Sequence, residues 1–227
     1  MLAVYKKELK TYILTPIGYI YIGLFLLILS MFFYISIYSS QYINFEYLFY
    51  DGSTLLIFII PLLTMRLFSE EKKNGTEQLL YTSPRSLTSI VLGKFFAAAT
   101  IVLITEILTL MYFVILSYFG SPSLPIALTT LLGFFLLSLS YIALGMFISS
   151  ITENQIISGI ATMFVFLFML FGSRITSILS PISLVYFFEE SFITGLIMVK
   201  DIILFVAFIL LFVLLTILVL QKRKSIK

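Results

Sequence analysis

The sequence of 227 residues contains no cysteine, no histidine and no tryptophan. A disulfide framework needs cysteine, and the common zinc sites and nucleophile–base pairs need cysteine or histidine. These kinds of chemistry are therefore excluded for the residues at hand. Charged residues are also scarce, at 11% of the chain, whereas about a quarter is usual in a soluble domain.

Apolar residues fill the chain instead, at 61% of the total. Because a run of about 20 apolar residues crosses the roughly 30 Å hydrocarbon layer, we expect an all-α polytopic membrane protein with six transmembrane helices. The second run contains Pro61 and reaches a spanning length only when it is extended back to Tyr47. The short connections leave no room for a separate soluble domain between the spans. The expected spans are residues 17–38, 47–68, 95–119, 126–150, 156–172 and 202–220.

The positive charges are distributed unevenly along the chain. Twelve of the 14 lysines and arginines fall before the first span, around the segment between spans two and three, and after the sixth span. They are Lys6, Lys7, Lys10, Arg66, Lys72, Lys73, Arg85, Lys94, Lys222, Arg223, Lys224 and Lys227. Since basic residues concentrate on the inner side of a membrane, we expect both termini in the cytoplasm and a multi-pass protein of the cytoplasmic (inner) membrane.

The N-terminal residues predict an amphipathic helix on the inner leaflet. Apolar residues from Leu2 to Ile13 recur on one helical face, and lysines occupy the others. Such a helix lies in the interface of the lipid bilayer with its lysines toward anionic headgroups. Pro16 then permits a turn into the first span. A solvated tail is the alternative, and a cleaved signal peptide is disfavoured by the length of the first run.

The outer segment of residues 173–201 is apolar but contains Pro181 and the pair Glu189 and Glu190. Irregular backbone at membrane depth is tolerated only when protein or a water-filled cavity covers it. The segment predicts either two short re-entrant helices that cap the spans or one interfacial helix that lies flat. The two glutamates are candidates for an outer gate, with ordinary solvated carboxylates as the alternative.

The cytoplasmic segment of residues 69–88 carries the densest mixture of charges in the chain. Gly75 offers a bend between the end of the second span and a further short helix. A charged helix that projects from a membrane domain is suited to docking into a soluble partner, but a solvated linker is equally consistent with the pattern. The candidate partner-binding residues are Glu70, Glu71, Lys72, Asn74, Gly75, Thr76, Glu77, Leu79 and Leu80.

A resemblance favours docking over a solvated linker. The residues that carry it are Pro61–Phe68, the charged run after them, Gly75–Glu77, Leu79–Leu80, Thr82–Pro84 and Gly93–Lys94. In this order and spacing they resemble the signature region of type-2 ABC transporter permeases, and most of all the branch of gliding-motility and copper-enzyme-maturation permeases.

The resemblance implies a coupling helix near Asn74 to Leu80 that sits on a separate ATP-binding subunit. It also implies an elbow helix at Leu2 to Leu14, a re-entrant helical pair before the last span, and a second permease copy, as a homo- or heterodimer. Export is the direction that it favours. ATP and Mg²⁺ are expected in the partner ATPase, and no cofactor is expected in this chain.

The chain is not expected to be an enzyme. A P-loop needs a glycine five residues before its Gly-Lys pair so that backbone amides cradle the phosphates, but Thr88 occupies that place before Gly93 and Lys94. The net charge is +3. Because the chain is expected to lie in a membrane, we do not take this positive charge as a sign of nucleic-acid binding, and no nucleic-acid partner is expected.

Glu106 is the only charge within the third expected span. At a rise of 1.5 Å per residue it lies roughly 18 Å beyond Lys94, near the middle of the bilayer. An ionisable residue at that depth is a functional candidate by default, here for the transport pathway. The alternative is a protonated glutamate that forms a hydrogen bond to a serine, threonine or tyrosine of a neighbouring span. Two other functions stay open: a secondary transporter or channel without an ATPase, and a membrane assembly factor.

Overall fold

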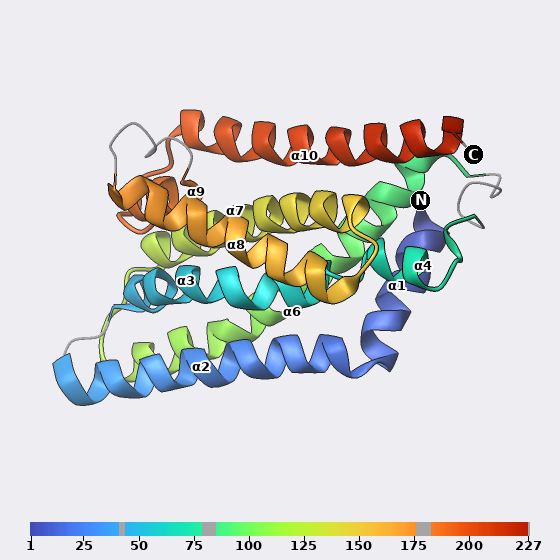
Figure 1. Cartoon of the computed structure of the whole chain (residues 1–227). Coiled ribbons are helices and arrows are strands. Elements are labelled where there is room, and N and C mark those ends of the chain that lie inside the picture. The colour runs from blue at the N-terminus through green and yellow to red at the C-terminus, as the bar shows by residue number, and fades with distance from the viewer. Residues whose placement is uncertain (41–43, 79–84, 176–182, 227) are drawn as a thin grey trace.

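The computed structural model describes residues 1–40, 44–78, 85–175 and 183–226. Throughout these ranges the regular structure is helical. Figure 1 shows long helices that lie side by side with both termini at the same end of the bundle. The helices are α1 (Leu2–Leu14), α2 (Pro16–Ser40), α3 (Phe45–Thr64), α4 (Ser69–Lys73), α6 (Leu87–Phe119), α7 (Leu124–Ile151), α8 (Gln155–Ile175), α9 (Leu184–Phe187), the π-helical turn η2 (Phe188–Phe192) and α10 (Val199–Ile226).

Six of the helices are long and apolar enough to cross a membrane, namely α2, α3, α6, α7, α8 and α10. The predicted all-α, six-span architecture is therefore confirmed. The most extended difference is in α6, which begins at Leu87 rather than at residue 95. The extra turns contain Gly93 and Lys94, and α1 packs against them. Pro61 does not break α3, which continues to Thr64. Proline is tolerated in membrane-spanning helices because neighbouring helices and side chains satisfy the backbone groups that it frees.

Helices α3 and α7 form the centre of the bundle. In the most apolar window of each, 61% of the residues are buried, against 22% in α2 and α10. The outer helices lie on opposite sides of this pair, with α10 along α7 and α2 along α3 and α6 (Figure 1). The exposed apolar side chains of the peripheral helices are therefore those that meet the surrounding hydrocarbon.

Aromatic rings fill the middle of the bundle. Phe134 of α7 lies 5.8 Å from Phe25 of α2, 4.9 Å from Phe49 of α3 and 6.0 Å from Phe188 of η2, measured between ring centroids. Such tilted and edge-to-face pairs add about 0.5–1.5 kcal/mol each beyond their buried area. One ring thus joins four elements that are far apart in the sequence.

At the end of the bundle opposite the termini, α9 and η2 pack onto α7 and the start of α10. The hydroxyls of Thr129 and Thr130 both lie 3.3 Å from the backbone oxygen of Phe192, and Ser191 Oγ donates to Asp201 Oδ2 at 2.5 Å. Asp201 is 1% exposed, so this carboxylate is part of the packed outer end of the bundle. The structure describes short helical turns over residues 184–192, and residues 176–182 of the predicted re-entrant segment lie outside the described ranges.

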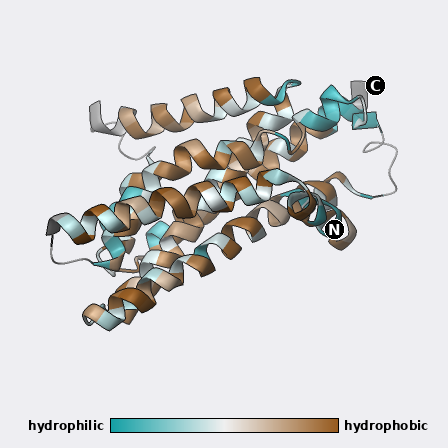
Figure 2. Cartoon of the chain, turned by 90° about the horizontal axis from the view of Figure 1, so that it is seen from below, coloured by the Kyte–Doolittle hydropathy of each residue, from teal (hydrophilic) through white to brown (hydrophobic). Residues whose placement is uncertain are grey.

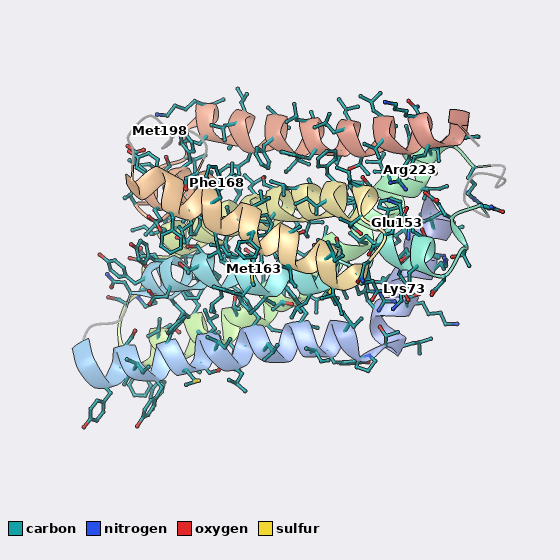
Figure 3. The ribbon with its side chains drawn as sticks, viewed as in Figure 1. Lys73, Glu153, Met163, Phe168, Met198 and Arg223 are labelled. Atoms are coloured by element: carbon teal, nitrogen blue, oxygen red, sulfur yellow. The ribbon has the colours of Figure 1, made fainter. Side chains whose placement is uncertain are left out.

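The two ends of the bundle differ in polarity. Figure 2 shows hydrophilic residues beside both marked termini, whereas the helices between the ends are largely apolar. Figure 3 places Lys73, Glu153 and Arg223 at this end and Met198 at the opposite one. The structure thus brings the N-terminal helix, α4 and the end of α10 together, as the distribution of basic residues predicts. We call this the basic end; its location in the cytoplasm stays a prediction.

Candidate functional site

The candidate site at the basic end is built around α4 and the turn that follows it. The chain leaves α3 at Thr64, and α4 runs from Ser69 to Lys73. The turn has Gly75 at φ +69°, a left-handed conformation that glycine adopts without steric cost. The predicted bend at Gly75 is therefore confirmed. A helix precedes Asn74, the residues from Asn74 to Thr76 form a turn, and helix resumes at Glu77. The predicted coupling helix near Asn74 to Leu80 stays a prediction, because Leu79 and Leu80 lie outside the described residues.

Ser149 of α7 holds the beginning of α4. Its hydroxyl accepts hydrogen bonds from the backbone amides of Phe68 at 3.0 Å and Ser69 at 3.1 Å, and it donates to the oxygen of Met65 at 3.2 Å. The first amides of a helix have no partner within it, so a buried α4 requires such an acceptor. One turn earlier, Gly145 leaves room for Thr64. The small residues of α7 thus have a packing role.

Four residues form an ion cluster that joins three helices. Lys94 of α6 lies with its Nζ atom 3.0 Å from Glu8 Oε1 of α1 and 2.9 Å from Glu71 Oε1 of α4. Lys7 lies 3.5 Å from Glu8 and 3.8 Å from Glu71. The Lys94 side chain is only 3% exposed, and its ammonium faces the ring of Phe68 at 5.3 Å. A buried ammonium is tolerated because two carboxylates surround it.

Gly93 explains how α1 reaches this cluster. A Cβ atom at this position would lie 2.9 Å from Val4 Cβ, so only glycine lets α1 approach α6 this closely. About two turns further along α6, Thr100 Oγ1 lies 3.0 Å from the hydroxyl of Tyr5. The predicted N-terminal helix is confirmed over Leu2–Leu14, and it packs against the body of the protein as well as exposing its lysines.

Arg66 forms a second link between α1 and α4. Its Nε atom lies 3.0 Å from Glu70 Oε2, its Nη1 atom donates to Thr15 Oγ1 at 3.3 Å, and its guanidinium lies 5.8 Å from the ring centroid of Tyr12. The Tyr12 hydroxyl donates to the oxygen of Leu63 at 2.9 Å. Burial, together with the nearby Glu8 carboxylate, raises the pKa of Tyr12, so the hydroxyl stays a neutral donor.

Two basic side chains connect α4 and the following turn to the ends of α7 and α10. Lys72 donates to the backbone oxygen of Ser150 and, at 3.3 Å, to that of Thr152. Arg223 lies 3.7 Å from Glu77 Oε1 and donates to the oxygen of Ile151 at 3.0 Å. Cations stabilise the carbonyls at a helix C-terminus, so both residues also complete α7.

The structure divides the predicted partner-binding residues into two groups. Glu70, Glu71, Lys72 and Glu77 contact the protein itself, and Glu77 is only 7% exposed. Asn74, Gly75 and Thr76 are exposed at the tip, as is Lys73. Leu79 and Leu80 lie outside the described residues. Glu8 and the roles of Lys94, Ser149 and Arg223 were not predicted, since no local pattern marks a contact between helices far apart in the chain.

Glu106 is buried within α6 and is 7% exposed. Both of its carboxylate oxygens are buried, and neither has a hydrogen-bond partner among the residues that the structure describes. Thr109 Oγ1 donates to the backbone oxygen of Glu106 at 2.6 Å and leaves the carboxylate unpaired. The alternative of a hydrogen bond to a neighbouring span is therefore wrong for this conformation.

The outer-gate candidates lie in η2 at the opposite end of the bundle. Glu190 is exposed and Glu189 is partly buried. They are separated from the ion cluster by the length of the bundle (Figure 1). Glu189 and Glu190 therefore belong to a second candidate site, distinct from the one at the basic end.

Six helices that are long and apolar enough to span a membrane, and a basic end whose exposed turn is flanked by residues bonded to four helices, define a polytopic membrane protein. The chain belongs to the ABC-2 family, since a family model described as "ABC-2 family transporter protein" matches residues 2–225. Members of this family are the membrane permeases of ABC transporters, and they typically pair with ATP-binding subunits and dimerise. No curated protein is matched by the sequence. The more specific resemblance to the gliding-motility and copper-enzyme-maturation branch stays a prediction.

Proposed function

We propose that this chain is the membrane-spanning subunit of an ATP-driven exporter. In this proposal, a separate ATP-binding subunit carries ATP and Mg²⁺ and docks on the basic end, and a second permease copy completes the transporter. The observation that supports the proposal best is the arrangement around α4. The exposed turn of Asn74, Gly75 and Thr76 is flanked by residues whose ionic and hydrogen-bonded contacts reach α1, α6, α7 and α10, namely Glu71, Lys72 and Glu77.

These links allow a force on the turn to reach the membrane-spanning helices. Glu71 connects α4 to Lys94 of α6, and Lys94 in turn connects to Glu8 of α1. Lys72 connects α4 to the end of α7. Removal of one partner from a buried ion pair costs about 3–5 kcal/mol, several times the thermal energy. The segment is therefore expected to move with these helices as one unit when the ATPase subunits close.

Glu106 is proposed to contribute to the transport pathway, and Glu189 and Glu190 to its outer gate. An unpaired carboxylate at mid-span lowers the stability of the protein, so an ionisable residue at this depth is a functional candidate by default. The two outer glutamates are placed by η2, and π-helical turns are frequent at functional sites.

The decisive experiment is purification of the full chain from its native membrane, followed by sequencing of the proteins that elute with it. We expect a stoichiometric subunit with P-loop sequence features, and we expect Asn74→Arg to reduce its recovery about tenfold or more, since a charged side chain at the centre of a docking site costs more than 1.4 kcal/mol. Ser121→Arg is the matched control, because Ser121 is an exposed polar loop residue near the opposite end.

Equal recovery with Asn74→Arg would contradict docking at the turn. The alternative of a secondary transporter or channel predicts a different result: the chain reconstituted alone would transport its substrate at the full rate without ATP. An assembly factor would elute with a secreted enzyme or its precursor instead of an ATPase.

A further inference from the structure

Glu106 lies in a groove between α6 and α7. The groove has a volume of about 230 Å³, and apart from Glu106 it is lined by apolar side chains, which are Leu103, Ile107, Leu110, Leu131, Leu132 and Phe135. Ile107 and Leu132 are exposed at 56% and 42%, so the groove opens toward the surroundings of the bundle and not toward its centre. In a spanning protein, such an opening faces hydrocarbon.

A second unpartnered polar atom lies at the same level. Glu106 is roughly 20 Å from the outer end of α6, and Ser138 is roughly 20 Å from the outer end of the antiparallel α7, at 1.5 Å per residue. The Ser138 hydroxyl is buried and has no hydrogen-bond partner among the described residues. Ser138 follows Phe135 by one helical turn and so lies on the same side of α7. Ser138 is fully buried and does not line the groove, so Glu106 is the polar residue at which a ligand of the groove would bind.

We propose that this groove binds the cationic head of an alkylammonium amphiphile, and that such amphiphiles are the substrate class of the transporter. The identification as substrate rests on the proposed function. A carboxyl group in a low-dielectric site is either protonated or held ionised by a positive charge and hydrogen-bond donors, and an ammonium head supplies both the charge and the donors. Because the groove is smaller than the 300–1,000 Å³ of ordinary ligand pockets, it accepts the head and the first carbons, and the alkyl chain stays in the hydrocarbon beside the exposed leucines.

A second copy of the chain does not supply the missing cation. All 14 lysines and arginines lie in the loops and tails or toward the helix ends. The one that lies furthest inside a span is Lys94, which its ion cluster already occupies, and it is about 18 Å from the level of Glu106 along α6. A ligand that enters from the bilayer therefore fits the groove better than a symmetry mate.

The test is photolabelling of the full chain in lipid nanodiscs with dodecylammonium that carries a diazirine next to its head. We expect saturable labelling of peptides around Ile107 and Leu132, competed by dodecylamine and not by dodecanol. Glu106→Gln should reduce labelling about tenfold or more, since a charge-assisted hydrogen bond is replaced by a neutral one. Glu46→Gln is the matched control, because it replaces a carboxylate in the first turn of α3. This variant should be labelled like the unmodified chain.

Two further variants keep the proposal open to refutation. Leu132→Trp fills the groove while Glu106 stays in place, and it should abolish the saturable labelling. Because the chain has no cysteine, an Ile107→Cys variant reports unambiguously on the neighbours of the groove. Rapid disulfide formation between two copies of this variant in membranes would show that a second copy covers the groove, and it would overturn the proposal. Equal saturable labelling of the Glu106→Gln variant would overturn it as well.

The labelling needs neither ATP nor a partner subunit, so its failure is distinguishable from failure of the proposed function. Labelling that depends on Glu106 without recovery of an ATP-binding subunit would refute the exporter and leave the site. Recovery of that subunit without labelling that depends on Glu106 would refute the site and leave the exporter.

Discussion

The ammonium of Lys94 lies 2.9 Å from Glu71 Oε1 and 3.0 Å from Glu8 Oε1. The three residues belong to different helices, and the lysine is almost fully buried. The contact makes Lys94 the point where the N-terminal helix, α4 and the third spanning helix α6 meet. Its charge is balanced there by two carboxylates, so the loss of the lysine leaves an excess of negative charge in a poorly solvated place.

Lys94→Met should therefore destabilise the protein by about 3–5 kcal/mol, because methionine retains the volume but leaves Glu8 and Glu71 without their buried partner. The measurement is the thermal midpoint of unfolding of the purified chain in detergent. Lys10→Met is the matched control, since Lys10 is exposed, and its midpoint should stay within the error of the measurement. A similar midpoint for both variants would show that the ion cluster contributes little.

The sequence predicted the helices of this fold well, because the physical signal for them is local. Runs of apolar residues identify the six spans, and Pro16 correctly marks the junction of α1 and α2. The start of α6 was missed by eight residues because the expected span begins after the charged Lys94. The helix instead begins after Ser86, whose hydroxyl accepts from the amide of Ser89 at 3.3 Å, and Lys94 is neutralised within it by the ion cluster.

The candidate site was predicted only in part, because its contacts depend on how helices pack. A run such as Glu70, Glu71 and Lys72 indicates a polar surface, but not which charges turn inward. Glu70 pairs with Arg66 one helical turn away, and Glu71 pairs with Lys94, which is distant in the chain. Lys72 binds the C-terminus of α7, which hydropathy does not mark. Among the described residues of the run, Lys73, the turn Asn74–Thr76 and Gln78 are exposed, whereas the sequence alone proposes the entire charged run for partner binding.

Ser149→Ala should loosen α4 from the bundle. The substitution removes the acceptor for the amides of Phe68 and Ser69, and each buried donor left unsatisfied costs about 1–3 kcal/mol. Hydrogen exchange at the amides of residues 68–73 should accelerate at least tenfold. Ser150→Ala provides the comparison, because the hydroxyl of Ser150 donates to the oxygen of Phe147 in its own helix and its backbone oxygen still accepts from Lys72. Equal exchange rates in the two variants would contradict the capping role of Ser149.

Tyr12→Phe tests the attachment of the N-terminal helix to α3. The change removes the hydrogen bond to the oxygen of Leu63 while it keeps the buried ring beside Arg66, so we expect a loss of about 0.5–1.5 kcal/mol in the free energy of unfolding. Because burial raises the pKa of Tyr12, the effect should be constant between pH 6 and 9, a range in which the hydroxyl remains protonated. Tyr19→Phe serves as the control, since Tyr19 is 63% exposed. A loss that varies across this range would indicate an ionised tyrosine.

Gly133→Ala should displace η2 from α7. A Cβ atom at Gly133 would overlap with the side chain of Phe192, whereas at Gly23, in the exposed α2, it would meet no atom within 4 Å. Overpacking of this kind costs about 1–3 kcal/mol, and the ring of Phe192 has little freedom because its own backbone oxygen is held by Thr129 and Thr130. We expect Gly133→Ala to lower the thermal midpoint and to speed cleavage near Phe192 by a protease added on that side of the membrane. Gly23→Ala should do neither. If both alanine variants behave alike, the close approach of η2 to α7 does not hold the outer end of the bundle in place.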